Sequence, residues 1–115
     1  MAKFVVDRQS WYRGHNSNES KLLRQDGTRC CIGFVGQQCG IADKDLLEVS
    51  SVATLNNGPY HSETHDKFPA WMRASFGVIK DAYMVNDKVD MTDAQREKEL
   101  QIIFSRFGDE IEFIN

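Results

Sequence analysis

The hydrophobic and polar positions of the chain follow strand-like spacing near both termini. Lys3-Phe4-Val5-Val6-Asp7 is a short run of β-branched and aromatic residues, and this run predicts a first strand. Glu110-Ile111-Glu112-Phe113 alternates polar with apolar side chains, as a half-buried strand does. We expect these terminal strands to share one sheet.

The longest apolar block lies in the central part of the chain and predicts a helix. Asp26-Gly27 is a turn signal, Thr28 to Cys31 can continue as a short strand, and the apolar positions from Cys31 to Cys39 predict a helix that the following glycine ends. Gly33 and Gly36 lie on one face of this helix. Small residues at this spacing favour close packing against a neighbouring element.

A capping box predicts the start of a second helix. Thr92-Asp93-Ala94-Gln95 carries this motif, and apolar residues at helical spacing continue the pattern from about Asp93 to Phe107. The pattern between the two helices is weaker. The short apolar runs from Val78 to Val85 fit a hairpin or a short helix, and the stretch from Val49 to Pro69 predicts a long irregular connection.

These elements predict a single α+β domain over residues 1–115. Its sheet is small and mostly antiparallel, includes both terminal strands, and is covered by the central helix and the C-terminal helix. A chain of 115 residues supports about one such domain. With 41% hydrophobic and 27% charged residues, the composition is typical of an ordered, soluble protein.

The charge and hydropathy of the chain exclude some classes of partner. The formal net charge of −3 argues against general nucleic-acid binding. Residues 1–30 nevertheless hold six basic and three acidic side chains, whereas residues 86–115 hold four basic and eight acidic ones. This asymmetry fits a basic face for a phosphate-bearing ligand or an ordinary solvated surface. No apolar run approaches the ~20 residues of a membrane span and no signal-peptide pattern is present, so we expect a cytoplasmic protein without membrane contact.

The cysteines and histidines suggest neither disulfides nor a metal. The chain has three cysteines, of which Cys30 and Cys31 are adjacent, so we expect free thiols in a reducing cytosol. Cys31 and Cys39 would lie about 12 Å apart along a helix, too far for one zinc ion. His61 and His65 are spaced i, i+4 without a third ligand nearby, which favours solvated histidines. We therefore expect no metal and no cofactor.

Several residues are candidates for a ligand-binding site, namely Trp11, Arg13, Gly14, Arg29, Asn86 and Asp87. The arginines and the N-terminus of the central helix would hold phosphate, and Trp11 or Tyr12 would stack on a base. Asn86 or Asp87 would read a base edge or a ribose hydroxyl. In the alternative interpretation, Trp11 fills the edge of the core and Arg13 pairs with a surface acid.

The same residues carry a resemblance to a group of small uncharacterised proteins of tailed phages and prophages. The pattern covers nearly the whole chain and consists of Trp11-x-Arg13-Gly14, Leu22-Leu23, Asp26-Gly27 leading to Cys30-Cys31-Ile32-Gly33-Phe34, Cys39-Gly40, Met84-x-Asn86-Asp87, Arg96 through Phe104 to Gly108, and Glu112-Phe113. Its most specific parts are the Cys-Cys-Leu/Ile-Gly element, here with isoleucine, and the Asn-Asp pair. The resemblance implies a phage origin and an accessory rather than a virion role in the host cytosol.

Two functional hypotheses follow from these features. In the first, a phage accessory protein binds and sequesters a small nucleotide-like host signalling ligand, or inhibits a host factor, without catalysis, and a homo-oligomer is compatible with this role. In the second, Cys30 or Cys31 is the nucleophile of an enzyme, with His61 or His65 as its base. Because cysteine is among the most buried residue types, packing is the simpler explanation for the adjacent thiols. We therefore favour the binding hypothesis.

Overall fold

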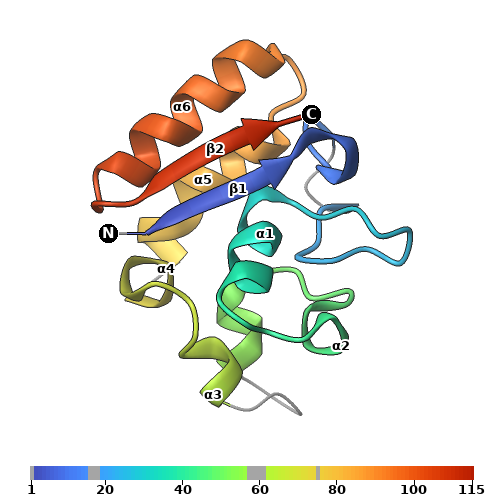
Figure 1. Ribbon diagram of the computed structural model, residues 1–115, viewed down its shortest axis with the longest axis vertical. Coiled ribbons are helices and arrows are strands. Elements are labelled where there is room, and N and C mark those ends of the chain that lie inside the picture. Colours follow the sequence, from blue (N-terminus) through green and yellow to red (C-terminus); the bar gives the residue numbers. More distant parts are fainter. Residues whose placement is uncertain (1, 16–18, 57–61, 75) are drawn as a thin grey trace.

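The computed structural model describes residues 2–15, 19–56, 62–74 and 76–115, and most of its regular elements are helices (Figure 1). In chain order the elements are β1 (Lys3–Asp7), η1 (Arg8–Ser10), α1 (Cys31–Gln38), α2 (Asp43–Leu46), η3 (Val52–Asn56), α3 (Ser62–His65), α4 (Ala70–Ala74), α5 (Phe76–Asp87), α6 (Asp93–Ser105) and β2 (Glu110–Ile114). The predicted α+β class is confirmed.

The two strands lie side by side and run in the same direction (Figure 1), with Lys3 paired to Glu110 and Asp7 to Ile114. The predicted antiparallel arrangement is therefore wrong, although both terminal strands do share one sheet. The reason lies in the connection, because the helices between the strands act as a long crossover that returns the chain to the end of the sheet where it started. Alternation along a strand reports which face is buried and carries no information about the direction of its partner.

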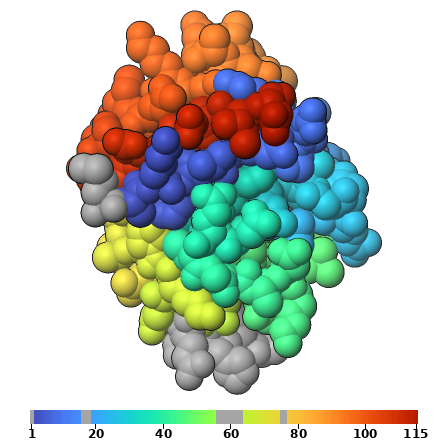
Figure 2. Space-filling model, in the orientation of Figure 1, coloured from blue at the N-terminus to red at the C-terminus, as the bar shows by residue number. Residues whose placement is uncertain are grey.

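One face of the sheet is buried against helices and the other faces solvent. Phe4, Val6, Ile111 and Phe113 are buried on the inner face, which contacts α1 and α6. Phe4 meets Phe104 of α6 edge to face, with ring centroids 6.2 Å apart. On the outer face the blue and red strands cross the surface together in Figure 2. The prediction that the central and C-terminal helices pack on the sheet is confirmed.

Helix α1 covers the second edge of β1 at Val5 and packs closely on its neighbours. The Gln38 side-chain amide donates to the Val5 carbonyl oxygen at 2.6 Å and accepts from the Val5 N–H at 2.8 Å, as a neighbouring strand would. A Cβ on Gly33 would collide with the backbone oxygen of Leu22. One on Gly36 would also be too close, lying 2.8 Å from a Phe68 ring carbon. The close packing predicted for these glycines is confirmed.

The later part of the chain forms two longer helices. Phe76–Asp87 is one 12-residue helix, so the hairpin alternative for Val78 to Val85 is wrong. Helix α6 begins at the predicted capping box, where the Gln95 N–H donates to Thr92 Oγ1 at 3.2 Å, and ends at Ser105. Helix α5 contacts α1, α4 and α6, and it therefore links the two helices that cover the sheet.

Two segments differ from the predicted pattern. The short strand expected from Thr28 to Cys31 does not form, and Arg29 makes only an isolated parallel bridge with Trp11. The stretch from Val49 to Pro69 is less irregular than expected, because η3 and α3 occupy parts of it. Residues 57–61 lie outside the described residues. No helix in the described part of the chain is long and apolar enough to cross a membrane.

Candidate functional site

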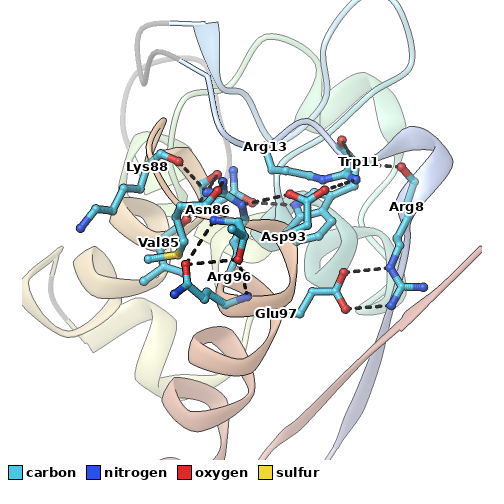
Figure 3. A network of polar contacts seen from close by, with 12 residues as sticks. Arg8, Trp11, Arg13, Val85, Asn86, Lys88, Asp93, Arg96 and Glu97 are labelled. Atoms are coloured by element: carbon cyan, nitrogen blue, oxygen red, sulfur yellow. Dashed lines mark hydrogen bonds and ion pairs between the residues drawn. The ribbon is translucent and has the colours of Figure 1, made fainter.

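Five of the predicted ligand-binding residues meet where the loop after η1 crosses the C-terminal end of α5 (Figure 3). Trp11 Nε1 donates to Asn86 Oδ1 at 2.8 Å, and the Gly14 N–H donates to the Asn86 carbonyl oxygen at 2.8 Å. The Asn86 amide also donates to Asp87 Oδ1 at 2.9 Å. We call this group, together with Arg13 and Arg96, the Asn86 network.

Asn86 is fully buried and uses its whole side-chain hydrogen-bonding capacity within the protein. Its Oδ1 accepts from Trp11 Nε1 and from the Cys31 N–H, the latter at 2.9 Å. Its Nδ2 donates to the Tyr12 carbonyl oxygen at 3.0 Å and to Asp87. A primary amide offers two acceptor lone pairs and two donor hydrogens, so nothing is left for a base edge. The bond to Cys31 also occupies the N-terminus of α1, where a phosphate was expected.

Arg96 is the residue of this network that sequence reasoning did not select. Its side chain is 2% exposed, and its Nη1 donates to the carbonyl oxygens of Val85, Asn86 and Lys88 at 2.7, 3.2 and 2.8 Å. Nη2 donates to the Met91 oxygen at 2.8 Å. Arg96 therefore holds the turn that connects α5 to α6 by satisfying the carbonyls at the end of α5.

A signal for Arg96 is present in the sequence. It precedes Leu100 by one helical turn and Ile103 by two, so it lies on the apolar face of α6. An arginine on a buried helical face needs several acceptors nearby, and the C-terminal carbonyls of a preceding helix supply them. Recognising this required knowing that the preceding segment, α5, is a helix, which the sequence left open.

Arg13 and Gly14 also serve the structure. Arg13 Nη1 donates to the carbonyl oxygens of Arg8 and Trp11, each at 3.0 Å, and Nη2 pairs with Asp93 Oδ2 at 3.0 Å. Its guanidinium lies over the Trp11 ring, 4.6 Å from the centroid. Gly14 has φ +71°, and a Cβ there would lie 3.0 Å from an Arg96 nitrogen. Glycine is therefore required both by the backbone and by its neighbour.

Arg29 joins this region through its backbone only. Its carbonyl oxygen accepts from the Tyr12 N–H at 2.8 Å, while its side chain extends to Asp43 at the start of α2. The guanidinium is buried, and its centre lies 5.7 Å from the Phe34 ring centroid. The structure thus does not bring the Arg13 and Arg29 guanidinium groups together on the same partners.

The uneven charge along the sequence is largely resolved by pairing between the two ends of the chain. Lys3 pairs with Glu112 at 3.0 Å, in the exposed face of the sheet. Arg8 forms a two-pronged contact with Glu97, with both nitrogen–oxygen distances 2.8 Å. Arg13 pairs with Asp93, an exposed acid, as the alternative interpretation expected. N-terminal cations therefore meet C-terminal acids, and this part of the surface is not a basic face.

The adjacent cysteines lie in the hydrophobic core. Cys30 and Cys31 are buried, and burial raises the pKa of the Cys30 thiol to about 12 and that of Cys31 well above its usual range. A nucleophilic cysteine needs a lowered pKa and access to substrate, and these thiols have neither. Of the two histidines considered as a base, His61 lies outside the described residues. His65 Nδ1 lies 3.3 Å from Asp66 Oδ1. Within the described ranges, no group of three or more metal-ligating side chains gathers.

An open groove of about 1110 Å³ lies between α5 and α6, next to the Asn86 network. Apolar side chains line it, namely Tyr83, Met84, Val85, Val89, Met91, Ile102 and Ile103. Charged or titratable groups surround these, namely His15, Lys80, Asp81, Asp87, Lys88, Glu99 and Arg106. Met84, Val89 and Ile102 are 58%, 73% and 46% exposed. Sequence reasoning missed this surface because exposed aliphatic residues carry no motif.

Asp87 belongs to both regions. Its carboxylate accepts hydrogen bonds from Asn86 and Ser20, and it also lines the groove. Burial raises the pKa of this carboxyl, and the hydrogen bonds oppose that shift without cancelling it. Of the predicted ligand-binding residues, Asp87 is therefore the one that lines this groove. Comparisons of the chain with protein families, curated proteins and solved structures found no match.

Proposed function

We propose that the protein is a non-catalytic binding protein and that its groove between α5 and α6 holds a helical segment of a partner protein. The carrying observation is the exposure of Met84, Val89 and Ile102 in one groove. Contiguous exposed aliphatic surface is typical of interaction sites. Grooves between helices commonly receive the apolar face of an amphipathic helix.

The charges of the groove favour a protein partner over a nucleotide. Lys80, Lys88 and Arg106 are accompanied by three acids, and Arg106 already lies 4.0 Å from Asp81. A site for a multiply charged phosphate ligand would instead concentrate uncompensated cations and backbone N–H groups. Of the two arginines expected to hold phosphate, Arg13 is engaged with protein oxygens and Arg29 lies 3.4 Å from Asp43.

The resemblance to small tailed-phage proteins makes a host protein the proposed partner and inhibition of that host factor the proposed outcome. In this proposal the Asn86 network fixes the α5–α6 turn, and the groove beside it provides the binding surface. A rigid turn is useful here because a preformed groove loses less conformational entropy on binding than a mobile one.

The test is capture from host lysate with matched baits. The wild-type chain is compared with Met84→Glu/Ile102→Glu, which places charge in the groove, and with Leu47→Glu as a control. Leu47 lies at the end of α2 and is 43% exposed, close to the 46% of Ile102. We expect a host protein that wild type and the Leu47 variant retain and the double variant loses.

Two results would contradict the proposal. Equal capture by all three baits would exclude the groove as the binding surface. A nucleotide-mass adduct in native mass spectrometry that is lost in Arg13→Ala would favour a small ligand at the Asn86 network instead. The same spectra report the number of subunits and so test the predicted homo-oligomer.

A further inference from the structure

The Asp87 carboxylate lies at the edge of an apolar groove. The described groups that donate hydrogen bonds to this carboxylate are neutral. Asn86 Nδ2 lies 2.9 Å from its Oδ1, and the Ser20 hydroxyl also donates to it. Other acids in this region have cationic partners: Asp93 pairs with Arg13 at 3.0 Å and Glu97 with Arg8 at 2.8 Å. Among the described residues, no Lys or Arg nitrogen forms such a pair with Asp87.

The nearest cations are committed elsewhere. Arg96 attracts the Asp87 carboxylate, but its Nη groups are taken by backbone carbonyl oxygens. Lys88 follows Asp87 directly, and it is an exposed residue that also lines the groove. Burial keeps the pKa of Asp87 above its usual range despite these neighbours, which indicates that its negative charge is incompletely compensated.

We infer that Asp87 is the specificity-determining residue of the groove and selects partner helices that place one Lys or Arg, flanked by bulky apolar side chains, over its carboxylate. This inference rests on the proposed function. Apolar flanks fit Met84 and Val89, which are exposed beside Asp87. The three acids of the groove are matched in number by Lys80, Lys88 and Arg106, so a partner with many cations gains no net attraction there. A single basic residue placed over Asp87 is therefore the complementary pattern.

The test is selection of binders from a displayed library of amphipathic helical peptides. Leucines are fixed at i, i+3, i+4 and i+7, and all other positions are randomised. Selections use wild type, Asp87→Asn and Met84→Glu/Ile102→Glu in parallel. Asparagine keeps an oxygen that accepts from Asn86, so the network stays intact, and circular dichroism and urea unfolding verify the fold of each variant.

We expect wild type to enrich peptides with Lys or Arg at one position between the leucines, and Asp87→Asn to lose this preference while still binding through the leucines. In the best peptide, Lys→norleucine should weaken binding to wild type roughly tenfold and leave binding to Asp87→Asn unchanged.

Each other outcome has a separate meaning. Peptides that depend on Met84 and Ile102 but show no basic preference would overturn the role of Asp87 and leave the proposed function standing. Failure to enrich any peptide that the double groove variant rejects would overturn the proposed function itself. A dimer of the chain that the double variant dissociates would mean that a second copy fills the groove, and would also overturn the inference.

Discussion

Consecutive residues at the C-terminal end of α5 belong to two regions of opposite character. The Asn86 side chain points into the protein, where all of its donors and acceptors form hydrogen bonds. Met84 and Asp87 line a groove that is open to solvent and lined by aliphatic side chains. One region fixes the fold, and the other is the surface that we propose for a partner.

In this proposal the polar motif and the binding surface do not coincide. Trp11, Arg13, Gly14 and Asn86 have the side chains that recognise nucleotides, but here they recognise one another. The exposed groove carries the less distinctive residues. If this comparison is right, changes in the network alter the stability of the protein, whereas changes at the exposed aliphatic residues of the groove alter binding alone.

The largest effect is expected for Arg96→Met. The substitution leaves four backbone carbonyl oxygens at the α5–α6 turn without their donor. We expect the free energy of unfolding to fall by about 3–5 kcal/mol in urea titrations. Arg96→Lys is the control, since one ammonium group lacks the planar fork and should recover only part of the loss. A wild-type urea midpoint for Arg96→Met would mean that the network does not hold the fold.

Asn86→Leu is expected to have the next largest effect. It removes the acceptor of Trp11 Nε1 and of the Cys31 N–H and leaves both donors buried. We expect a loss of about 2–4 kcal/mol, measured by the same urea titration. Trp11→Phe, which removes one of these donors and keeps most of the apolar volume, should cost less. If the two variants were equally stable, the remaining contacts of Asn86 would carry no energy.

Arg13→Ala should cost about 1–2 kcal/mol, because it removes hydrogen bonds to two carbonyl oxygens and a partly exposed ion pair. Asp93→Asn removes the ion pair but keeps the carbonyl hydrogen bonds of Arg13, so it should lower the free energy of unfolding by only about 0.5 kcal/mol at neutral pH. Thermal or urea unfolding measures both. Loss of a ligand without loss of stability in Arg13→Ala would reverse this interpretation and return Arg13 to a binding site.

Asp87 and Asp93 should give opposite pH dependences. Burial raises the pKa of Asp87, so its contribution to stability is greatest below the ordinary carboxyl range and declines as pH rises through the raised pKa. Arg13 lowers the pKa of Asp93, so that contribution is present above the ordinary range and is lost as pH falls. Asp87→Asn should therefore gain stability relative to wild type as pH rises towards neutrality, and Asp93→Asn should lose it. Parallel pH profiles of the two variants would contradict these assignments.

The groove variant should have the smallest effect on stability. Met84→Glu/Ile102→Glu changes side chains that are 58% and 46% exposed, so the free energy of unfolding should stay within about 0.5 kcal/mol of wild type for each exposed site. Urea unfolding of the same preparation that is used for capture provides the measurement. A loss comparable to that of Asn86→Leu would show that the groove residues support the core.

Much of the local structure could be predicted from short-range patterns. β1 follows from its β-branched run, α1 from its apolar block and terminal glycine, and the start of α6 from Thr92 and Gln95. The direction of β2 could not be predicted, because strand direction depends on the whole crossover. Helix α5 was ambiguous because its apolar runs are short.

The site was predictable only in part. The sequence selected Trp11, Gly14 and Asn86 as ligand-binding candidates, and the structure brings them together. Whether such residues face a ligand or each other depends on tertiary hydrogen bonds, which the sequence does not reveal. Arg96 was missed because its acceptors are backbone carbonyls of another helix. The groove was missed because isolated exposed aliphatic residues are common on protein surfaces and become informative only when they share one concave surface.

One NMR titration tests the central comparison most directly. The indole N–H of Trp11 reports on the Asn86 network, the methyl group of Met84 reports on the groove, and the buried Met72 methyl is an internal control. The titrant is the host protein captured by wild type. We predict that the Met84 methyl signal shifts or broadens while the Trp11 and Met72 signals stay in place. A shift of the Trp11 indole with an unchanged Met84 signal would place the binding site at the network and contradict the account.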